Sequence, residues 1–126
     1  MTNQPMLGVM LDCSRNAVPN MQSAKYFIDG LEKMGYNTLM YYTEDTYEVE
    51  NEPYFGYLRG RFTTEELREL DAYSEAHGIE LVPCVQTLAH LRTAFRWSAD
   101  TPINDTADIL LMDDERTYLL IEMIFR

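Results

Sequence analysis

Apolar residues alternate along the chain between short continuous runs and longer stretches with helical spacing. Three short runs are bounded by polar or turn-forming residues, and this pattern predicts buried strands. The runs are Met6–Asp12, Thr38–Thr43 and Ile79–Val85. Between the first two runs, apolar side chains recur three and four residues apart over Met21–Met34, which predicts an amphipathic helix. Asn20 is a favoured N-cap residue, and Gly35 is typical of the position just after a helix.

Two further helices are predicted downstream. Thr63 and Glu66 have the spacing of a capping box, so a second helix is expected to start there and to end before Gly78. After the third strand, the stretch Gln86–Thr106 has no clear period and predicts an irregular connection. Asp113–Arg126 predicts a third helix, with acidic residues in its first turn and apolar residues around most of its surface.

The order of these elements defines the fold class. Strands that alternate with helices predict an α/β fold with a parallel sheet and right-handed crossovers. Polar loops follow each strand, and in a (β/α)8 barrel this is the face on which sites are built. Three βα units cannot close such a barrel, which needs eight strands. We therefore expect residues 1–126 to be the N-terminal fragment of a larger barrel domain, or a partner chain to cover the apolar third helix.

Composition limits the classes of partner. The 126 residues carry a formal net charge of −11, which argues against nucleic acid and anionic membrane surfaces, since both attract clustered Lys and Arg. The absence of a leader and of a long apolar run predicts a cytoplasmic protein. Cys13 and Cys84 are expected to be free, buried thiols, because they lack the spacing of a zinc site. No metal or cofactor is expected.

The stretch Leu39–Arg61 is the most unusual part of the sequence. It passes from a strand into a long run of carboxylates and tyrosines, and it closes on Arg59 and Arg61. Loops of this length are often functional, and this one contains too many aromatic residues for a disordered segment. Acids, tyrosines and arginines after a strand favour a polar ligand rich in hydroxyl groups. The tyrosines could stack on sugar rings or could simply pack the loop onto the barrel rim.

Several motifs, in this order and spacing, resemble glycoside hydrolase family 20, the β-N-acetylhexosaminidases. They are Asp12 and Arg15 after the first strand; Thr43, Glu44 and Asp45 after the second; Gly60, Phe62, Thr63, Glu65 and Glu66 at the entry to the second helix; Gly78–Pro83 in the third strand; and Ala89 and His90 after it. The resemblance covers nearly the whole chain. Some positions depart from the family pattern, namely Glu44, Cys84, Gln86 and Ala89.

The resemblance implies a (β/α)8 catalytic domain that hydrolyses terminal β-linked N-acetylglucosamine or N-acetylgalactosamine. In that family the acetamido oxygen of the substrate attacks the anomeric carbon, an Asp orients the acetamido group, and an adjacent Glu is the general acid. This Asp-Glu pair follows the fourth strand, beyond Arg126. Asp114 and Glu115 form such a dipeptide but lack the preceding H-x-G-G motif, so we assign them no catalytic role. The 126-residue chain is therefore expected to be inactive by itself.

The resemblance also implies roles for five residues. Arg15 would hold sugar hydroxyl groups, and the alternative is a salt bridge to one of the loop acids. Asp12 would orient Arg15 or merely end the strand. Glu44, Asp45 and His90 would form a supporting charge network, whereas the alternatives are a solvated acidic loop and a hydrogen-bonded loop histidine.

Two other functions remain open at this stage. The chain could be a small α/β binding or assembly module that forms homo-oligomers through its open sheet edges and the helix Asp113–Arg126. It could also belong to a different barrel enzyme with similar opening strands.

Overall fold

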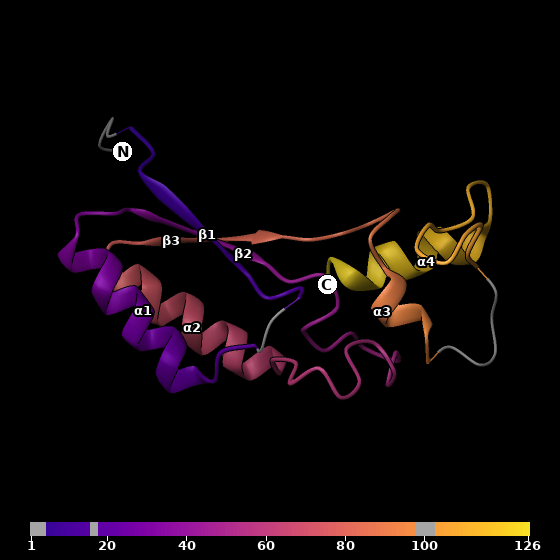
Figure 1. Cartoon of the computed structure of the whole chain (residues 1–126), viewed down its shortest axis with the longest axis horizontal. Coiled ribbons are helices and arrows are strands. Elements are labelled where there is room, and N and C mark those ends of the chain that lie inside the picture. Colours follow the sequence, from indigo (N-terminus) through magenta and orange to yellow (C-terminus); the bar gives the residue numbers. More distant parts are fainter. Residues whose placement is uncertain (1–4, 16–17, 98–102) are drawn as a thin grey trace.

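A computed structural model describes residues 5–15, 18–97 and 103–126. Its centre is a three-stranded parallel sheet, as the sequence predicted, and the strands lie in the order β1-β2-β3 (Figure 1). The strands are β1 (Gly8–Asp12), β2 (Thr38–Tyr42) and β3 (Glu80–Cys84). Each strand is one or two residues shorter at one or both ends than the apolar run that predicted it. The carboxyl ends of all three strands lie at one edge of the sheet, and the loops that follow them are therefore neighbours in space.

The register of the sheet separates its two faces. Val9 pairs with Leu39, which pairs with Leu81, so these three side chains project from the same face. On the other face Met10 lies beside Met40, and the Met10 side chain is about half exposed. Val9, Leu39 and Leu81 pack in one hydrophobic cluster with residues of the helices, so the helices cover the first face.

Helices α1 (Met21–Lys33) and α2 (Thr64–Ala76) lie side by side on the covered face of the sheet (Figure 1). The Asn20 side chain accepts a hydrogen bond from the backbone of Ser23, which confirms the predicted cap. Thr63 and Glu66 form the complete capping box. Both helices end before a glycine, as predicted.

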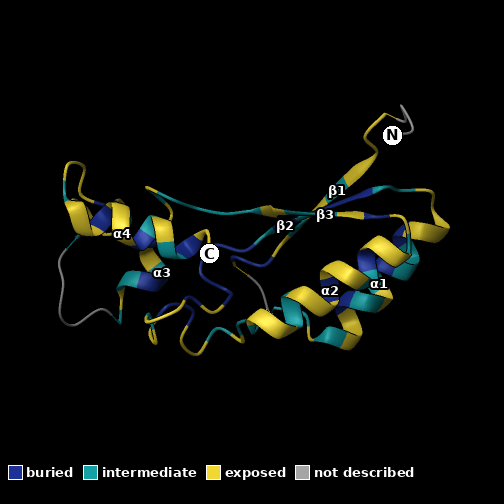
Figure 2. Ribbon diagram, turned by 180° about the vertical axis from the view of Figure 1, so that it is seen from behind, coloured by how far each residue is buried: buried dark blue, intermediate teal, exposed yellow. Residues whose placement is uncertain are grey.

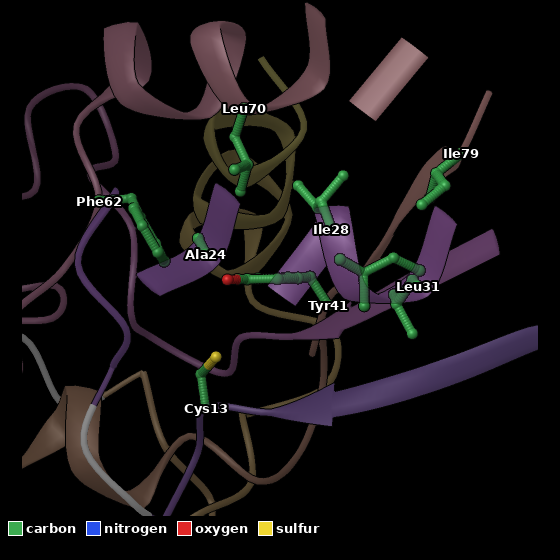
Figure 3. Packing of buried hydrophobic residues seen from close by; sticks show 9 residues of the cluster. Cys13, Ala24, Ile28, Leu31, Tyr41, Phe62, Leu70 and Ile79 are labelled. Atoms are coloured by element: carbon green, nitrogen blue, oxygen red, sulfur yellow. The ribbon is translucent and has the colours of Figure 1, made fainter. Parts of the chain in front are cut away.

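The main hydrophobic core lies between this sheet face and the two helices. Ile28 of α1, Leu70 of α2 and Tyr41 of β2 meet there, and Figure 3 shows their side chains converging with that of Phe62. Ile28 and Leu70 are fully buried. Burial of such side chains contributes roughly 1.5–3 kcal/mol each, so this core is the main source of stability for the β1–β3 unit.

The C-terminal third of the chain forms a second cluster beyond the carboxyl edge of the sheet (Figure 1). It contains a short helix, α3 (Arg92–Phe95), and α4 (Glu115–Ile124). Leu91, Leu110 and Leu120 are buried there against Tyr47 and Phe55 of the long β2–α2 loop. The long loop therefore belongs to both halves of the structure and joins them.

Two expectations for this region need correction. The stretch predicted as irregular contains α3, while its residues 98–102 lie outside the described part. The last helix starts at Glu115, two residues later than predicted, and ends at Ile124. The late start has a local cause, because Asp113 has a left-handed φ of 63° and the Asp114 side chain caps the helix by accepting from the Arg116 backbone.

Exposed apolar residues occur near the first strand, in the long loop and on α4. Figure 2 shows exposed residues along α4. Tyr118 and Leu119 are each 51% exposed and Phe125 is 66% exposed, so one side of α4 has no cover within the described residues. None of the described helices combines the length and the apolar character needed to cross a bilayer.

The two cysteines are free thiols in different surroundings. Cys13 is buried, and this burial raises its pKa from 9.0 to about 11, whereas Cys84 is partly exposed. We expect Ellman's reagent at pH 8 to modify Cys84 in the folded chain and Cys13 only after unfolding in urea, because the thiolate is the reactive species. The folded state should also lose stability between about pH 9 and 11, where only the unfolded Cys13 ionises.

A Cys84→Ser variant is the control, because it isolates the reaction of Cys13. Rapid modification of this variant under native conditions would contradict the burial of Cys13.

Candidate functional site

Two adjacent carboxylates lie directly after β2, at the carboxyl edge of the sheet. Glu44 and Asp45 are each only 1% exposed. This burial excludes the alternative of a solvated acidic loop, at least for these two residues. A buried carboxylate is costly unless a cation and hydrogen bonds compensate it, so the partners of these residues determine the local structure.

Arg15 is the partner of Glu44. Its Nη1 atom donates to both carboxylate oxygens of Glu44, at 2.8 Å from Oε1 and 2.9 Å from Oε2. Thr93 of α3 adds a longer hydrogen bond from its hydroxyl to Oε2, at 3.4 Å. The Arg15 side chain is nevertheless 65% exposed, and its hydrogen bonds to described residues all use Nη1. Arg15 thus makes the salt bridge of the alternative interpretation, and most of its side chain remains exposed.

Arg59 is the partner of Asp45. Its Nε atom lies 3.1 Å from Asp45 Oδ1, and its Nη2 atom donates to the backbone carbonyl of Ser14. The Arg59 side chain is only 16% exposed. The second carboxylate oxygen, Oδ2, is buried and has no partner among the described residues. The β2–α2 loop therefore neutralises its own buried carboxylate and binds the β1–α1 loop through one guanidinium.

The backbone around the carboxylates forms a tight turn. Glu44 has a left-handed φ of 49°, and both the backbone and the hydroxyl group of Thr46 donate to the carbonyl of Thr43, at 3.0 and 2.8 Å. Farther along the loop, Gly56 has φ 68° and packs directly on the turn, because a Cβ atom at this position would lie 2.1 Å from the Asp45 carbonyl oxygen. Only glycine fits this approach without a shift of the loop.

Asp12 turns the chain immediately before Arg15. Its Oδ1 atom accepts a hydrogen bond from the Ser14 backbone at 2.8 Å. Hydrogen bonds from Ser14 hold the pKa of Asp12 below its usual value, and the Arg15 charge contributes less. Asp12 makes no hydrogen bond to the Arg15 side chain within the described residues. It therefore acts on Arg15 through the backbone of the intervening turn.

His90 is not joined to the carboxylates in this structure. It lies after β3 in the left-handed region, with φ 63°, and its side chain is exposed. No hydrogen bond or ion pair connects it to Glu44, to Asp45 or to any other described residue. The predicted network of His90 with these carboxylates remains a prediction.

The described part of the chain also contains no group of three His, Cys, Asp or Glu side chains that could hold a metal ion.

The tyrosines of the long loop pack mostly against one another and against aromatic neighbours. Tyr47 is buried against Phe55, with ring centroids 5.2 Å apart, and burial raises its pKa above the usual value. Tyr57 contacts Tyr54 at 5.9 Å and Trp97 at 5.4 Å, all in edge-to-face geometry. Loop packing accounts for these rings, although Tyr54 and Tyr57 keep exposed surface.

A cavity of about 620 Å³ lies elsewhere, on the helix side of the sheet between α2, β3 and the end of α4. Arg15, Glu44 and Asp45 do not line it. Its lining includes charged side chains, among them Glu65, Arg68 and Asp71. We place the candidate site at the carboxyl edge of the sheet because Arg15, Glu44 and Asp45, which the sequence singled out, are brought together there.

Sequence reasoning missed two members of the site. Arg59 was noted at the end of the acidic loop but had no assigned partner, and Thr93 had no role. Arg59 lies fourteen positions after Asp45 along an irregular loop, so no helix or strand period could have paired them. Thr93 reaches Glu44 only because α3, which was not predicted, lies beside the carboxylate.

Several solved glycoside hydrolases share this fold. A Flavobacterium johnsoniae chitobiase matches with a TM-score of 0.79 and 23% identity over 95% of this chain. A mutant Streptomyces plicatus β-hexosaminidase in complex with its product, GlcNAc, matches with a TM-score of 0.80 and 19% identity over 93% of this chain. A Vibrio harveyi exo-β-N-acetylglucosaminidase in complex with N-acetylglucosamine matches with a TM-score of 0.77 and 18% identity over 94% of this chain.

These likenesses establish the fold: the chain has the α/β arrangement of the first βα units of family 20 hexosaminidases. It spans 21%, 28% and 24% of those three chains, respectively. No protein-family model matches the sequence. No curated protein matches it either.

A pair of glycine variants tests the packing of the loop on the buried carboxylates. Gly56 and Gly60 have nearly the same left-handed φ, 68° and 67°, but a Cβ atom at Gly60 meets only Val18 at 4.0 Å. We expect Gly56→Ala to lower the free energy of unfolding by roughly 1–3 kcal/mol more than Gly60→Ala, measured by urea denaturation, because only the first overlaps a backbone atom. Equal losses would mean that the contact with Asp45 is unimportant.

Proposed function

We propose that this chain forms the N-terminal part of the catalytic domain of a β-N-acetylhexosaminidase. The enzyme would hydrolyse terminal β-linked N-acetylglucosamine or N-acetylgalactosamine by the substrate-assisted, retaining route. The observation that carries the proposal is the exposed Arg15 guanidinium, oriented by buried Glu44 at the carboxyl edge of a sheet with the hexosaminidase fold. Two of the similar proteins are described with GlcNAc bound, which supports an N-acetylhexosamine as the ligand.

In this proposal Arg15 is the residue of the chain that touches the sugar. A guanidinium has several donors in a fixed plane, a geometry suited to neighbouring ring hydroxyl groups. Glu44 holds one end of the guanidinium through Nη1, so the remaining donors point in a constant direction. Pre-orientation of this kind lowers the entropy that binding would otherwise cost.

The other candidate residues support Arg15 and do not cleave the bond. Asp12 shapes the turn before Arg15, and Asp45 anchors the long loop through Arg59. His90 would join the carboxylates only after a rearrangement of the loop that follows β3. None of these residues supplies the general acid or the acetamido-orienting Asp, so the 126-residue chain should bind the sugar without hydrolysing it.

Binding of N-acetylglucosamine to the 126-residue chain is the direct test, followed by NMR titration. We expect Arg15→Met to weaken binding by about tenfold or more, because a hydrogen bond to a charged group contributes roughly 1.5–3 kcal/mol. Arg116→Met is the matched control, since Arg116 is 51% exposed and, among the described residues, its side chain pairs with Asp114, the N-cap of α4. Unchanged affinity in Arg15→Met would contradict the proposed role.

The same preparations should release no chromophore from a nitrophenyl N-acetylglucosaminide above background. Turnover that disappears on change of Asp114 or Glu115 would overturn the assignment of this chain as an inactive part. An H-x-G-G-D-E motif encoded about one or two βα units past Arg126 would support the parent enzyme.

A second candidate function is an assembly module, and the uncovered side of α4 favours it. Tyr118, Leu119 and Phe125 are exposed on that helix, and the open sheet offers unpaired strand edges. If the chain self-associates through α4, Leu119→Glu should shift a concentration-dependent dimer to monomer in sedimentation equilibrium. Tyr26→Glu is the control, because the Tyr26 side chain is exposed on α1. A monomer at all concentrations would exclude this function.

A further inference from the structure

Arg59, near the end of the long loop, joins two segments of the candidate site. Its Nε atom donates to Asp45 after β2, and its Nη2 atom donates to the carbonyl of Ser14 after β1. Asp45 is 1% exposed and Ser14 is 2% exposed, so both acceptors lie in the interior. A guanidinium is suited to this bridge because its donors diverge in a fixed plane.

A hydrogen bond to the Ser14 carbonyl restrains the backbone immediately before Arg15. Ser14 directly precedes Arg15, and its backbone N–H is already held by Asp12 at 2.8 Å. The two consecutive peptide units that flank the Ser14 Cα atom are therefore both held: Asp12 binds the N–H of the Cys13–Ser14 unit, and Arg59 binds the carbonyl of the Ser14–Arg15 unit. Glu44 then fixes the far end of the Arg15 side chain. Without Arg59, the carbonyl of Ser14 could rotate and carry Arg15 with it.

We infer that Arg59 is a positioning residue for Arg15, an inference that rests on the sugar-binding role proposed above. Arg59 does not touch the sugar. Because Arg59 binds both Asp45 and the Ser14 carbonyl, the position of Asp45 constrains the Ser14–Arg15 peptide. The long loop therefore sets the direction in which the Arg15 side chain extends toward the ligand. Because Glu44 and Asp45 are consecutive, the same two-residue turn orients Arg15 twice, directly through Glu44 and indirectly through Asp45 and Arg59.

A purely structural role for residue 59 would require only a positive charge, whereas the positioning role requires two hydrogen-bond donors. Neutralising buried Asp45 requires only a cation, which a lysine supplies. Positioning requires two divergent donors, and the single ammonium group of lysine cannot reach Asp45 and Ser14 in the same geometry. Arg59→Lys therefore separates the two roles, whereas Arg59→Met removes both.

Arg61→Lys is the matched control. Arg61 lies two residues further along the same loop, and its Nη1 atom donates to the carbonyls of Pro53 and Phe55 within that loop. It makes no hydrogen bond to the β1–α1 loop or to Glu44 and Asp45 among the described residues. The substitution changes the same chemical group without touching the bridge.

The experiment combines three measurements on the 126-residue chain and its variants: the midpoint of urea unfolding, the Nε–H resonance of Arg15 in nitrogen-15 spectra, and the affinity for N-acetylglucosamine. For Arg59→Lys we expect an unfolding midpoint close to that of the original chain, a shifted and broadened Arg15 resonance, and at least fivefold weaker binding. For Arg61→Lys we expect the resonance and the affinity to stay unchanged. Arg59→Met should lose stability as well.

Two results would overturn the inference, and they differ from a failure of the proposed function. An Arg15 resonance in Arg59→Lys that matches the original chain would show that Arg59 does not position Arg15, whatever the sugar affinity. Unchanged affinity despite a moved resonance would show that the position is irrelevant to binding. If the original chain itself binds no N-acetylglucosamine, the sugar-binding function fails, and with it the functional part of the inference, while the resonance still reports the bridge.

Discussion

Two consecutive buried carboxylates, Glu44 and Asp45, are the constraint on which the candidate site depends. Each is compensated by an arginine from a different segment, Arg15 for Glu44 and Arg59 for Asp45. Breaking one partner from a buried pair leaves an uncompensated charge, which is far more costly than loss of an exposed salt bridge. The three segments that carry these residues are therefore held in one arrangement, and the exposed part of Arg15 has a defined direction.

The arrangement of the two cores explains how the long loop can hold this position. Phe62, at the end of the loop, packs in the first core between the sheet and α1 and α2, while Tyr47 and Phe55 pack in the second core with α4. The loop is thus anchored at both ends and in its middle, and Gly56 allows it to lie directly on the carboxylate turn. A loop anchored in this way pays less ordering entropy on binding a small polar ligand than an unanchored loop would.

Much of the fold was accessible from the sequence because its signals are local. The short apolar runs predicted β1, β2 and β3, and Thr63 with Glu66 predicted the start of α2, since strand periods and capping patterns involve neighbouring residues. Arg15, Glu44 and Asp45 could be proposed because their motifs resemble a known family. The pairing of Arg59 with Asp45 could not, because residues of an irregular loop meet only when the loop has folded.

The sequence by itself determined the order and kind of the main elements, the parallel α/β class and the acidic loop after β2. Only the tertiary structure decided that Glu44 and Asp45 are buried, that Arg15 and Arg59 compensate them, and that His90 stands apart from both. The physical reason is burial: a carboxylate has the same local sequence signal in water and in the interior, but only in the interior does it require a specific cation. Which arginine compensates which buried carboxylate depends on the chain segments that packing brings together.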